Sequence, residues 1–134
     1  MSYETKNVLS FKREINSNLE GAIDRLTSAL NDEGFGVLTR IDLHSKIKEA
    51  IGKDLRPVVI LGVCNPQLAF DAYQYDPEVV ALLPCNAVIR DIADGCLSVE
   101  LTRPSSMMKI LDDKNLIALA KEADVKLERV LEMF

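Results

Sequence analysis

The pattern of apolar and polar positions divides the chain into segments with strand and helix periodicity. Asn7–Arg13 alternates between apolar and polar residues, which is typical of a half-buried strand. Ser17-Asn18-Leu19-Glu20 fits a helix-capping box with Ser17 as the cap, and apolar residues follow at helical spacing as far as Gly34. Val58–Cys64 is apolar at six of its seven positions and does not alternate. We therefore expect this strand at the centre of a sheet, with both faces covered.

The remaining segments continue this succession of strands and helices to the end of the chain. Asn65-Pro66 and Asp76-Pro77 each combine a helix cap with a proline at the first helical position, and an Asp-Gly pair between the last two strands favours a hairpin. Further strands are predicted at Phe35–Leu43, Cys85–Ile92 and Cys96–Thr102, helices at Ser45–Ile51, Pro66–Tyr75 and from about Lys114 onward, and a short helical or irregular run at Glu78–Leu83. The order β-α-β-α-β-α-β-β-α indicates an α+β domain with a single mixed or antiparallel sheet and helices mainly on one face.

Length and charge restrict the function classes. The 134 residues allow one domain, which we expect to span residues 1–134 without a linker. Sixteen Lys and Arg against 21 Asp and Glu give a net charge of −5, which repels phosphate, so nucleic acid is not an expected partner. No segment approaches the roughly 20 apolar residues of a membrane span, and the first residues lack the apolar core of a signal peptide. The expected location is the cytoplasm, away from the membrane.

The chain has three cysteines, Cys64, Cys85 and Cys96, an odd number that is too few for a disulfide scaffold. Cys64 ends one predicted strand and Cys85 begins the next. If these strands are parallel, their thiols lie at opposite ends of the sheet, and if the strands are antiparallel, the thiols share one end. The two helix starts between the strands favour a connection that runs out and back, and therefore the antiparallel arrangement. A helix beginning beside Cys64 would also lower the pKa of its thiol.

Two motifs around these cysteines are more specific than the general pattern. Gly62-Val63-Cys64-Asn65-Pro66 and Leu82-Leu83-Pro84-Cys85-Asn86-Ala87-Val88, together with Glu33–Leu38 and Ile41-Asp42, resemble the DUF302 family of bacterial and archaeal domains. The resemblance extends over roughly Leu9 to Thr102, and the paired Cys-Asn motifs are similar to one branch of that family. It implies a small α+β domain that often stands alone and is dimeric, and it implies no activity or cofactor.

The Cys-Asn motifs define a candidate ligand-binding site at one end of the sheet. The thiols would form a soft, nearly apolar wall, and the asparagines would present hydrogen-bond donors and acceptors to a small molecule. The candidate residues are Cys64, Asn65, Cys85 and Asn86, with Asp42 or Arg40 contributing charge.

Three interpretations of the cysteines remain open. The first is a ligand pocket in a noncatalytic binding or accessory module that forms a homodimer. The second is a thiol-based redox or soft-metal-binding protein that uses Cys64 and Cys85, although their wide spacing identifies neither a metal nor a cofactor. The third is a purely structural interaction protein in which both residues are small buried hydrophobes. The sequence contains no nucleophile elbow and no nucleotide-binding motif, and His44 is expected at the surface or as a helix cap, so catalysis is not the expected role.

Overall fold

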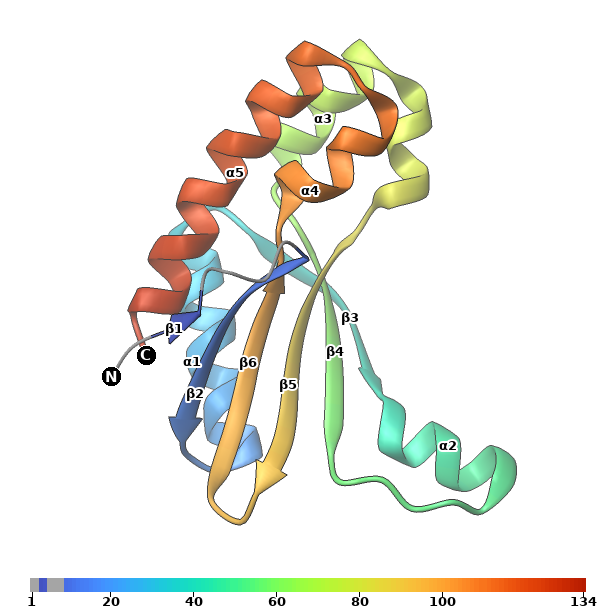
Figure 1. Cartoon of the computed structure of the whole chain (residues 1–134), viewed down its shortest axis with the longest axis vertical. Coiled ribbons are helices and arrows are strands. Elements are labelled where there is room, and N and C mark those ends of the chain that lie inside the picture. The colour runs from blue at the N-terminus through green and yellow to red at the C-terminus, as the bar shows by residue number, and fades with distance from the viewer. Residues whose placement is uncertain (1–2, 5–8) are drawn as a thin grey trace.

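The computed structural model describes residues 3–4 and 9–134 and contains a six-stranded sheet with the order β1-β2-β6-β5-β4-β3 (Figure 1). Every pair of neighbouring strands is antiparallel. The predicted α+β class and element order are confirmed, and the sheet is of the antiparallel type. The strands are β1 (Tyr3–Glu4), β2 (Ser10–Asn16), β3 (Gly36–Asp42), β4 (Val58–Cys64), β5 (Cys85–Ala93) and β6 (Cys96–Thr102).

Two long helices, α1 and α5, lie against the same face of the sheet, and α2 projects away from the rest of the molecule (Figure 1). Among the described residues, no helix is long and apolar enough to cross a bilayer. The helices are α1 (Leu19–Asp32), α2 (Leu43–Ile51), α3 (Pro66–Tyr75), α4 (Pro104–Met108) and α5 (Lys114–Glu132), with 3₁₀ turns η1 (Pro77–Leu82) and η2 (Lys109–Leu111).

The main core lies between the sheet and helices α1 and α5. Val59, Leu61 and Val63 occupy alternate positions of β4 and are at most 1% exposed. They belong to one buried cluster with Leu26 of α1 and Leu127 of α5. Full burial of an aliphatic side chain of this size contributes about 1.5–3 kcal/mol, so this cluster holds both helices on the sheet.

No helix covers the opposite face of the sheet in the part of the chain that the structure describes (Figure 1). One row of directly paired residues across this face consists of Ile41, Ile60 and Val88, followed by Glu100 and Lys12. This row is therefore apolar over β3, β4 and β5 and charged over β6 and β2. The prediction that both faces of β4 are covered is wrong in part, because Ile60 is only partly buried, among its neighbours in this row rather than beneath a helix.

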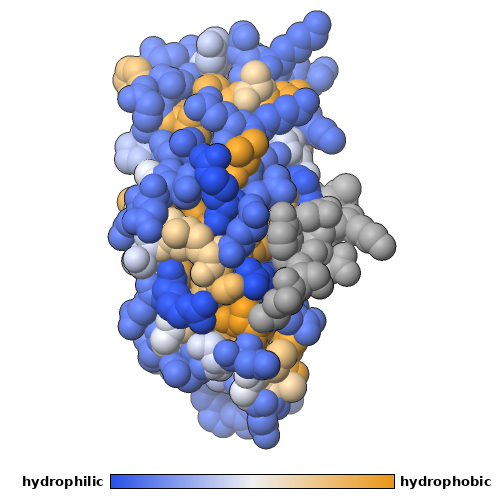
Figure 2. Space-filling view, turned by 90° about the vertical axis from the view of Figure 1, so that its left-hand side faces the viewer, coloured by the Kyte–Doolittle hydropathy of each residue, from blue (hydrophilic) through white to orange (hydrophobic). Residues whose placement is uncertain are grey.

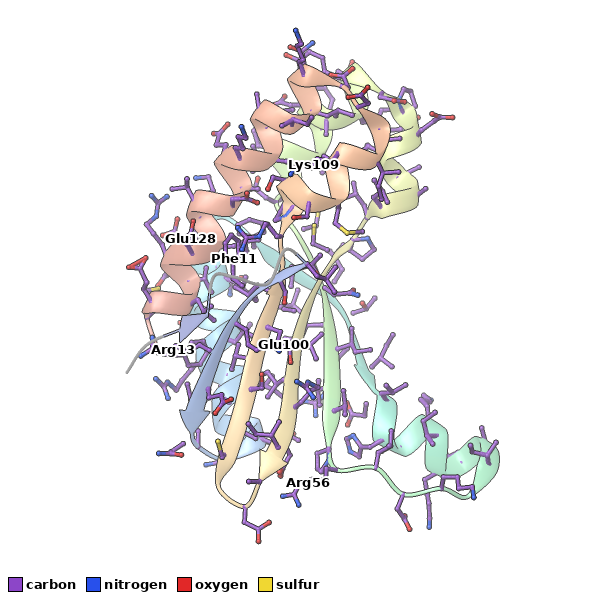
Figure 3. The ribbon with its side chains drawn as sticks, viewed as in Figure 1. Phe11, Arg13, Arg56, Glu100, Lys109 and Glu128 are labelled. Carbon is purple, nitrogen blue, oxygen red and sulfur yellow. The ribbon has the colours of Figure 1, made fainter. Side chains whose placement is uncertain are left out.

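Polar side chains form hydrogen bonds in the charged part of this face and, separately, at the C-terminal end of α5. Glu100 Oε2 accepts hydrogen bonds from Arg90 Nε at 2.6 Å and from Ser98 Oγ at 3.1 Å. Arg13 reaches across to the last turn of α5, where its Nη1 donates to the carbonyl oxygen of Leu131 at 2.9 Å (Figure 3). The surface on the side of α5 is mainly hydrophilic, with small apolar patches (Figure 2).

A second, smaller core lies beyond the ends of β4 and β5, where α3, η1, α4 and α5 meet (Figure 1). Each of these helical segments contributes one or two buried residues to this core. Every segment therefore needs the others to cover its apolar side. They are Ala72, Val79, Met108, Leu116 and Ala120.

Two local predictions differ from the structure at the start of the chain. The cap of α1 is Asn18 rather than Ser17, because Asn18 has the extended backbone of a cap and its Oδ1 accepts from Gly21 N at 2.7 Å. The strand predicted at Asn7–Arg13 is β2, which runs from Ser10 to Asn16 and ends later than predicted, because its pairing with β6 continues as far as Asn16. Residues 7 and 8 of the predicted strand lie outside the described residues.

Candidate functional site

Cys64 and Cys85 lie at the same end of the sheet. In the antiparallel pair β4–β5, Cys85 is directly opposite Val63, the residue before Cys64. Strand geometry then places the Cα atoms of the two cysteines about 6 Å apart. The out-and-back connection is confirmed, because α3 and η1 occupy the segment between the two strands. Both thiols are free.

The two cysteines line one partly open cavity of about 60 Å³ beyond the sheet end. Its walls come from β4, β5, α3, η1, α4 and α5, and most of them are apolar side chains such as Leu68, Leu116 and Ala120. Sulfur atoms lie in this region, where α4 meets the upper ends of β4 and β5 (Figure 3). The cavity is therefore formed by the smaller core rather than by the main one.

Asn65 caps α3 at the edge of this cavity. Its Oδ1 accepts a hydrogen bond from Leu68 N at 3.1 Å, and Pro66 occupies the first helical position, as the sequence predicts. Among the described residues that line the cavity, Asn65 has the only amide side chain. Its acceptor oxygen is engaged in the cap, so the cavity offers a ligand mainly carbon and sulfur surface.

Burial controls the ionisation of both thiols. Desolvation raises the pKa of Cys64, and it raises the pKa of Cys85 to about 11, with smaller contributions from the negative charges of Cys64 and Asp124. The prediction of a lowered pKa for Cys64 is therefore wrong, because desolvation of its partly buried thiol raises the pKa. Both thiols are protonated at neutral pH, a state that disfavours nucleophilic chemistry.

The other predicted site residues do not reach the cavity. Asn86 is exposed and pairs with Gly62, and it is not part of the cavity wall. Gly36 pairs with Cys64, whereas Arg40 and Asp42 lie four and six residues further along β3, or roughly 13 and 20 Å away. The expectation that either residue contributes charge to the Cys-Asn site is therefore wrong, since the strand carries them toward its other end.

Arg40 is instead the centre of an ion-pair cluster over α1. Its Nη2 lies 2.8 Å from Glu20 Oε2, and its Nε lies 2.8 Å from Asp42 Oδ1. The hydrogen bonds to Arg40 lower the pKa values of Glu20 and of Asp42. Exposed pairs of this kind contribute little stability, which agrees with a local role at the sheet edge.

His44 has a structural position at the start of α2. Its Nδ1 lies 3.1 Å from Val58 N, so the ring can accept the hydrogen bond of the first residue of β4. Among residues 3–4 and 9–134, no group of three or more His, Cys, Asp or Glu side chains is arranged to hold a metal ion.

The side chains of α4 and α5 that close the cavity are not recognisable as site residues from the sequence. Met108, Leu116 and Ala120 belong to segments whose apolar positions are evident in the sequence. Periodicity shows that such positions are buried, but it does not show which other element they cover.

Comparison with known proteins identifies a family and a similar solved structure. Residues 11–134 match the family model described as "Domain of unknown function DUF302". The crystal structure of an uncharacterized conserved protein DUF302 from Bacillus stearothermophilus is similar to the chain, with a TM-score of 0.88 and 27% sequence identity. The match covers 95% of this chain and 98% of that one. The search of curated proteins found no match.

Proposed function

The chain belongs to the DUF302 family, and from the geometry of its cavity we propose that it is a noncatalytic binding module for a small ligand. The observation that carries this proposal is the sulfur-containing apolar cavity at the sheet end, to which both Cys-Asn motifs of the sequence contribute, through Cys64, Asn65 and Cys85. A concave, mostly apolar site with few polar groups is the usual form of a small-ligand pocket.

The size of the cavity restricts the ligand. An apolar protein cavity of about 150 Å³ accepts benzene. The cavity here has about 60 Å³, so it accommodates a group of few atoms or the end of an alkyl chain. The raised pKa values of Cys64 and Cys85 disfavour nucleophilic attack by a free thiolate at neutral pH, which supports a binding role over a catalytic one.

Xenon binding tests whether the cavity accepts a guest. Xenon enters dry apolar cavities and needs no specific polar contact. Methyl-labelled protein under xenon pressure should show saturable chemical-shift changes at Val63, Leu68 and Leu116, which line the cavity. Equal, non-saturable changes throughout the molecule would contradict the proposal and favour a purely structural role.

We further propose that the protein forms a homodimer through the outer edge of β3. Leu38 and Ile41 on this strand are 63% and 43% exposed, and Ile51 at the end of the projecting helix α2 is 64% exposed. In the described part of the chain β3 has a strand neighbour on one side only. A second copy related by a two-fold axis would pair this edge and cover these side chains.

Two finer assignments belong to the same proposal. The motifs Cys64-Asn65 and Cys85-Asn86 support a place in the family branch with paired Cys-Asn motifs. The free state of all three cysteines supports a reducing compartment such as the cytoplasm.

A further inference from the structure

Three sulfur-bearing side chains from three separate elements line the same cavity. Cys64 comes from the end of β4, Cys85 from the start of β5 and Met108 from the end of α4. Cys85 pairs with Val63, the residue before Cys64, on the neighbouring antiparallel strand, and Met108 belongs to the smaller core that closes the sheet end. The register and the packing of α4 bring these groups together, although they are distant in the sequence.

The donor set around the cavity is soft. Its described wall contains no carboxylate and no imidazole, and the only amide oxygen, that of Asn65, already accepts from Leu68 N. Thiolate and thioether sulfur select monovalent copper over Mg²⁺, Ca²⁺ and Mn²⁺, which prefer oxygen ligands. A cavity of about 60 Å³ also suits a single ion better than a whole metabolite.

We propose that Cys64, Cys85 and Met108 bind a soft monovalent cation of the Cu⁺ type, an assignment that rests on the small-ligand function proposed above and names its ligand. On binding, each of the two cysteine thiols releases its proton to solvent, and each thiolate sulfur forms one bond to the ion, with the Met108 thioether as a third, weaker donor. The ion keeps its oxidation state throughout.

Two features of the surroundings act on the charge of this centre. Two thiolates and one monovalent cation carry a net charge of −1, and the positive end of the α3 dipole lies beside Cys64. Asp124 of α5 opposes this effect, because its negative charge acts on Cys85. Its Oδ1 accepts a hydrogen bond from Ser105 N at 3.1 Å, which compensates part of that charge.

Competition for Cu⁺ tests the assignment. Reduced, full-length protein is titrated without oxygen against the Cu⁺ chelator bathocuproine disulfonate, whose absorbance reports the chelator-bound ion. We expect the protein to retain one Cu⁺ per chain. Loss of an outer-shell partner of a metal site can weaken binding by about 100-fold. Cys64→Ser and Cys85→Ser each remove a direct ligand, so each should weaken Cu⁺ binding by more than this. Met108→Leu should weaken it less, and Cys96→Ser, the matched control away from the cavity, should not change it.

X-ray absorption of the copper-loaded wild type gives a second measurement that does not depend on the folding of any variant. It should show sulfur as the nearest neighbour of the ion and no nitrogen or oxygen. Failure to retain Cu⁺, retention by the Cys64→Ser, Cys85→Ser double variant, or a nitrogen or oxygen neighbour would each overturn the assignment. If xenon still binds while Cu⁺ does not, the small-ligand function stands and only the identity of the ligand fails.

Discussion

Cys85 is paired with Val63 across β4 and β5, and this register sets Cys64 and Cys85 side by side at the end of the sheet. The relationship depends on two antiparallel strands whose connection, α3 and η1, turns back over the same end. The helices of that connection, together with α4 and α5, then close a cavity over both thiols. A shift of one residue in the register would exchange Val63 for Cys64 opposite Cys85 and turn a different side chain toward the core.

Filling the cavity should abolish xenon binding. Ala120 is 5% exposed and lines the cavity, so the two additional methyl groups in Ala120→Val occupy the space that the guest needs. Overpacking of a core costs about 1–3 kcal/mol, which the fold should tolerate. Methyl chemical shifts under xenon pressure measure the loss. Ala118→Val on the exposed side of the same helix is the control and should bind xenon as the wild type does.

The metal-free protein should lose stability at alkaline pH through Cys85. Its pKa is raised by burial from an ordinary value near 9 to about 11, so the folded state holds the proton more tightly than the unfolded state. The associated stability is complete below about pH 9 and is lost as the pH rises toward 11, by at most about 2–3 kcal/mol. Urea unfolding at pH 7 and pH 10.5 measures this loss. Cys85→Ala should lose less over the same interval, and an equal loss in both proteins would contradict the assignment to Cys85.

Asn65 should stabilise α3 as a helix cap. Asn65→Ala removes the acceptor of the Leu68 N–H hydrogen bond and should lower the free energy of unfolding by about 1 kcal/mol. Asn65→Asp keeps an acceptor at the cap and should remain close to the wild type. Chemical denaturation of the three proteins distinguishes these cases, and equal losses for Ala and Asp would show that the cap is not the source of the effect.

Gly62 should not accept a side chain. A Cβ atom at this position would clash with Thr39 Oγ1 and lie 3.0 Å from Pro84 Cγ. Gly62→Ala should therefore destabilise the protein by about 1–3 kcal/mol, measured as a lower melting temperature. The double variant Gly62→Ala, Thr39→Ala removes the nearer of the two obstructions. It should recover part of the loss, and no recovery would place the strain elsewhere.

Charge on the outer edge of β3 should separate the proposed dimer. Leu38→Lys and Ile41→Lys place a solvated ammonium group where the second copy would pack, and edge lysines also prevent strand pairing. Light scattering after size-exclusion chromatography should report a dimer for the wild type and a monomer for both variants. Ile110→Lys changes a side chain that is 70% exposed on η2, away from this edge, and should leave the dimer intact. A monomeric wild type would contradict this part of the proposal.

The sequence predicted the local structure well where a single stretch of chain determines it. The bounds of β4 agree with the structure because they are marked by a continuous apolar run and a following Asn-Pro helix start. Asn65 is confirmed as a cap for the same reason, since its side-chain acceptor and the Leu68 N–H that donates to it are only three residues apart. The cap of α1 was predicted one residue too early, because Ser17 and Asn18 are both good cap residues and only backbone conformation distinguishes them.

The candidate site was predicted only as far as strand register could be inferred. Cys64 and Cys85 meet because the out-and-back connection makes their strands antiparallel. The sequence places Arg40 too close to the cysteines. The knowledge that two strands are neighbours does not give the distance of a residue along β3. The contribution of Met108 was not foreseen, since it depends on how α4 and α5 pack over the sheet end, and this packing is nonlocal.

The walls of the cavity extend along the chain from Phe35 to Ala123, so α4 and α5, which close it, follow both cysteines in the sequence. While the protein is being synthesised, Cys64 and Cys85 therefore emerge before α4 and α5 can cover them. Until these helices dock, both thiols are exposed to the surrounding solution. Docking of α4 and α5 then reduces the exposure of both thiols, which are half-buried in the folded protein.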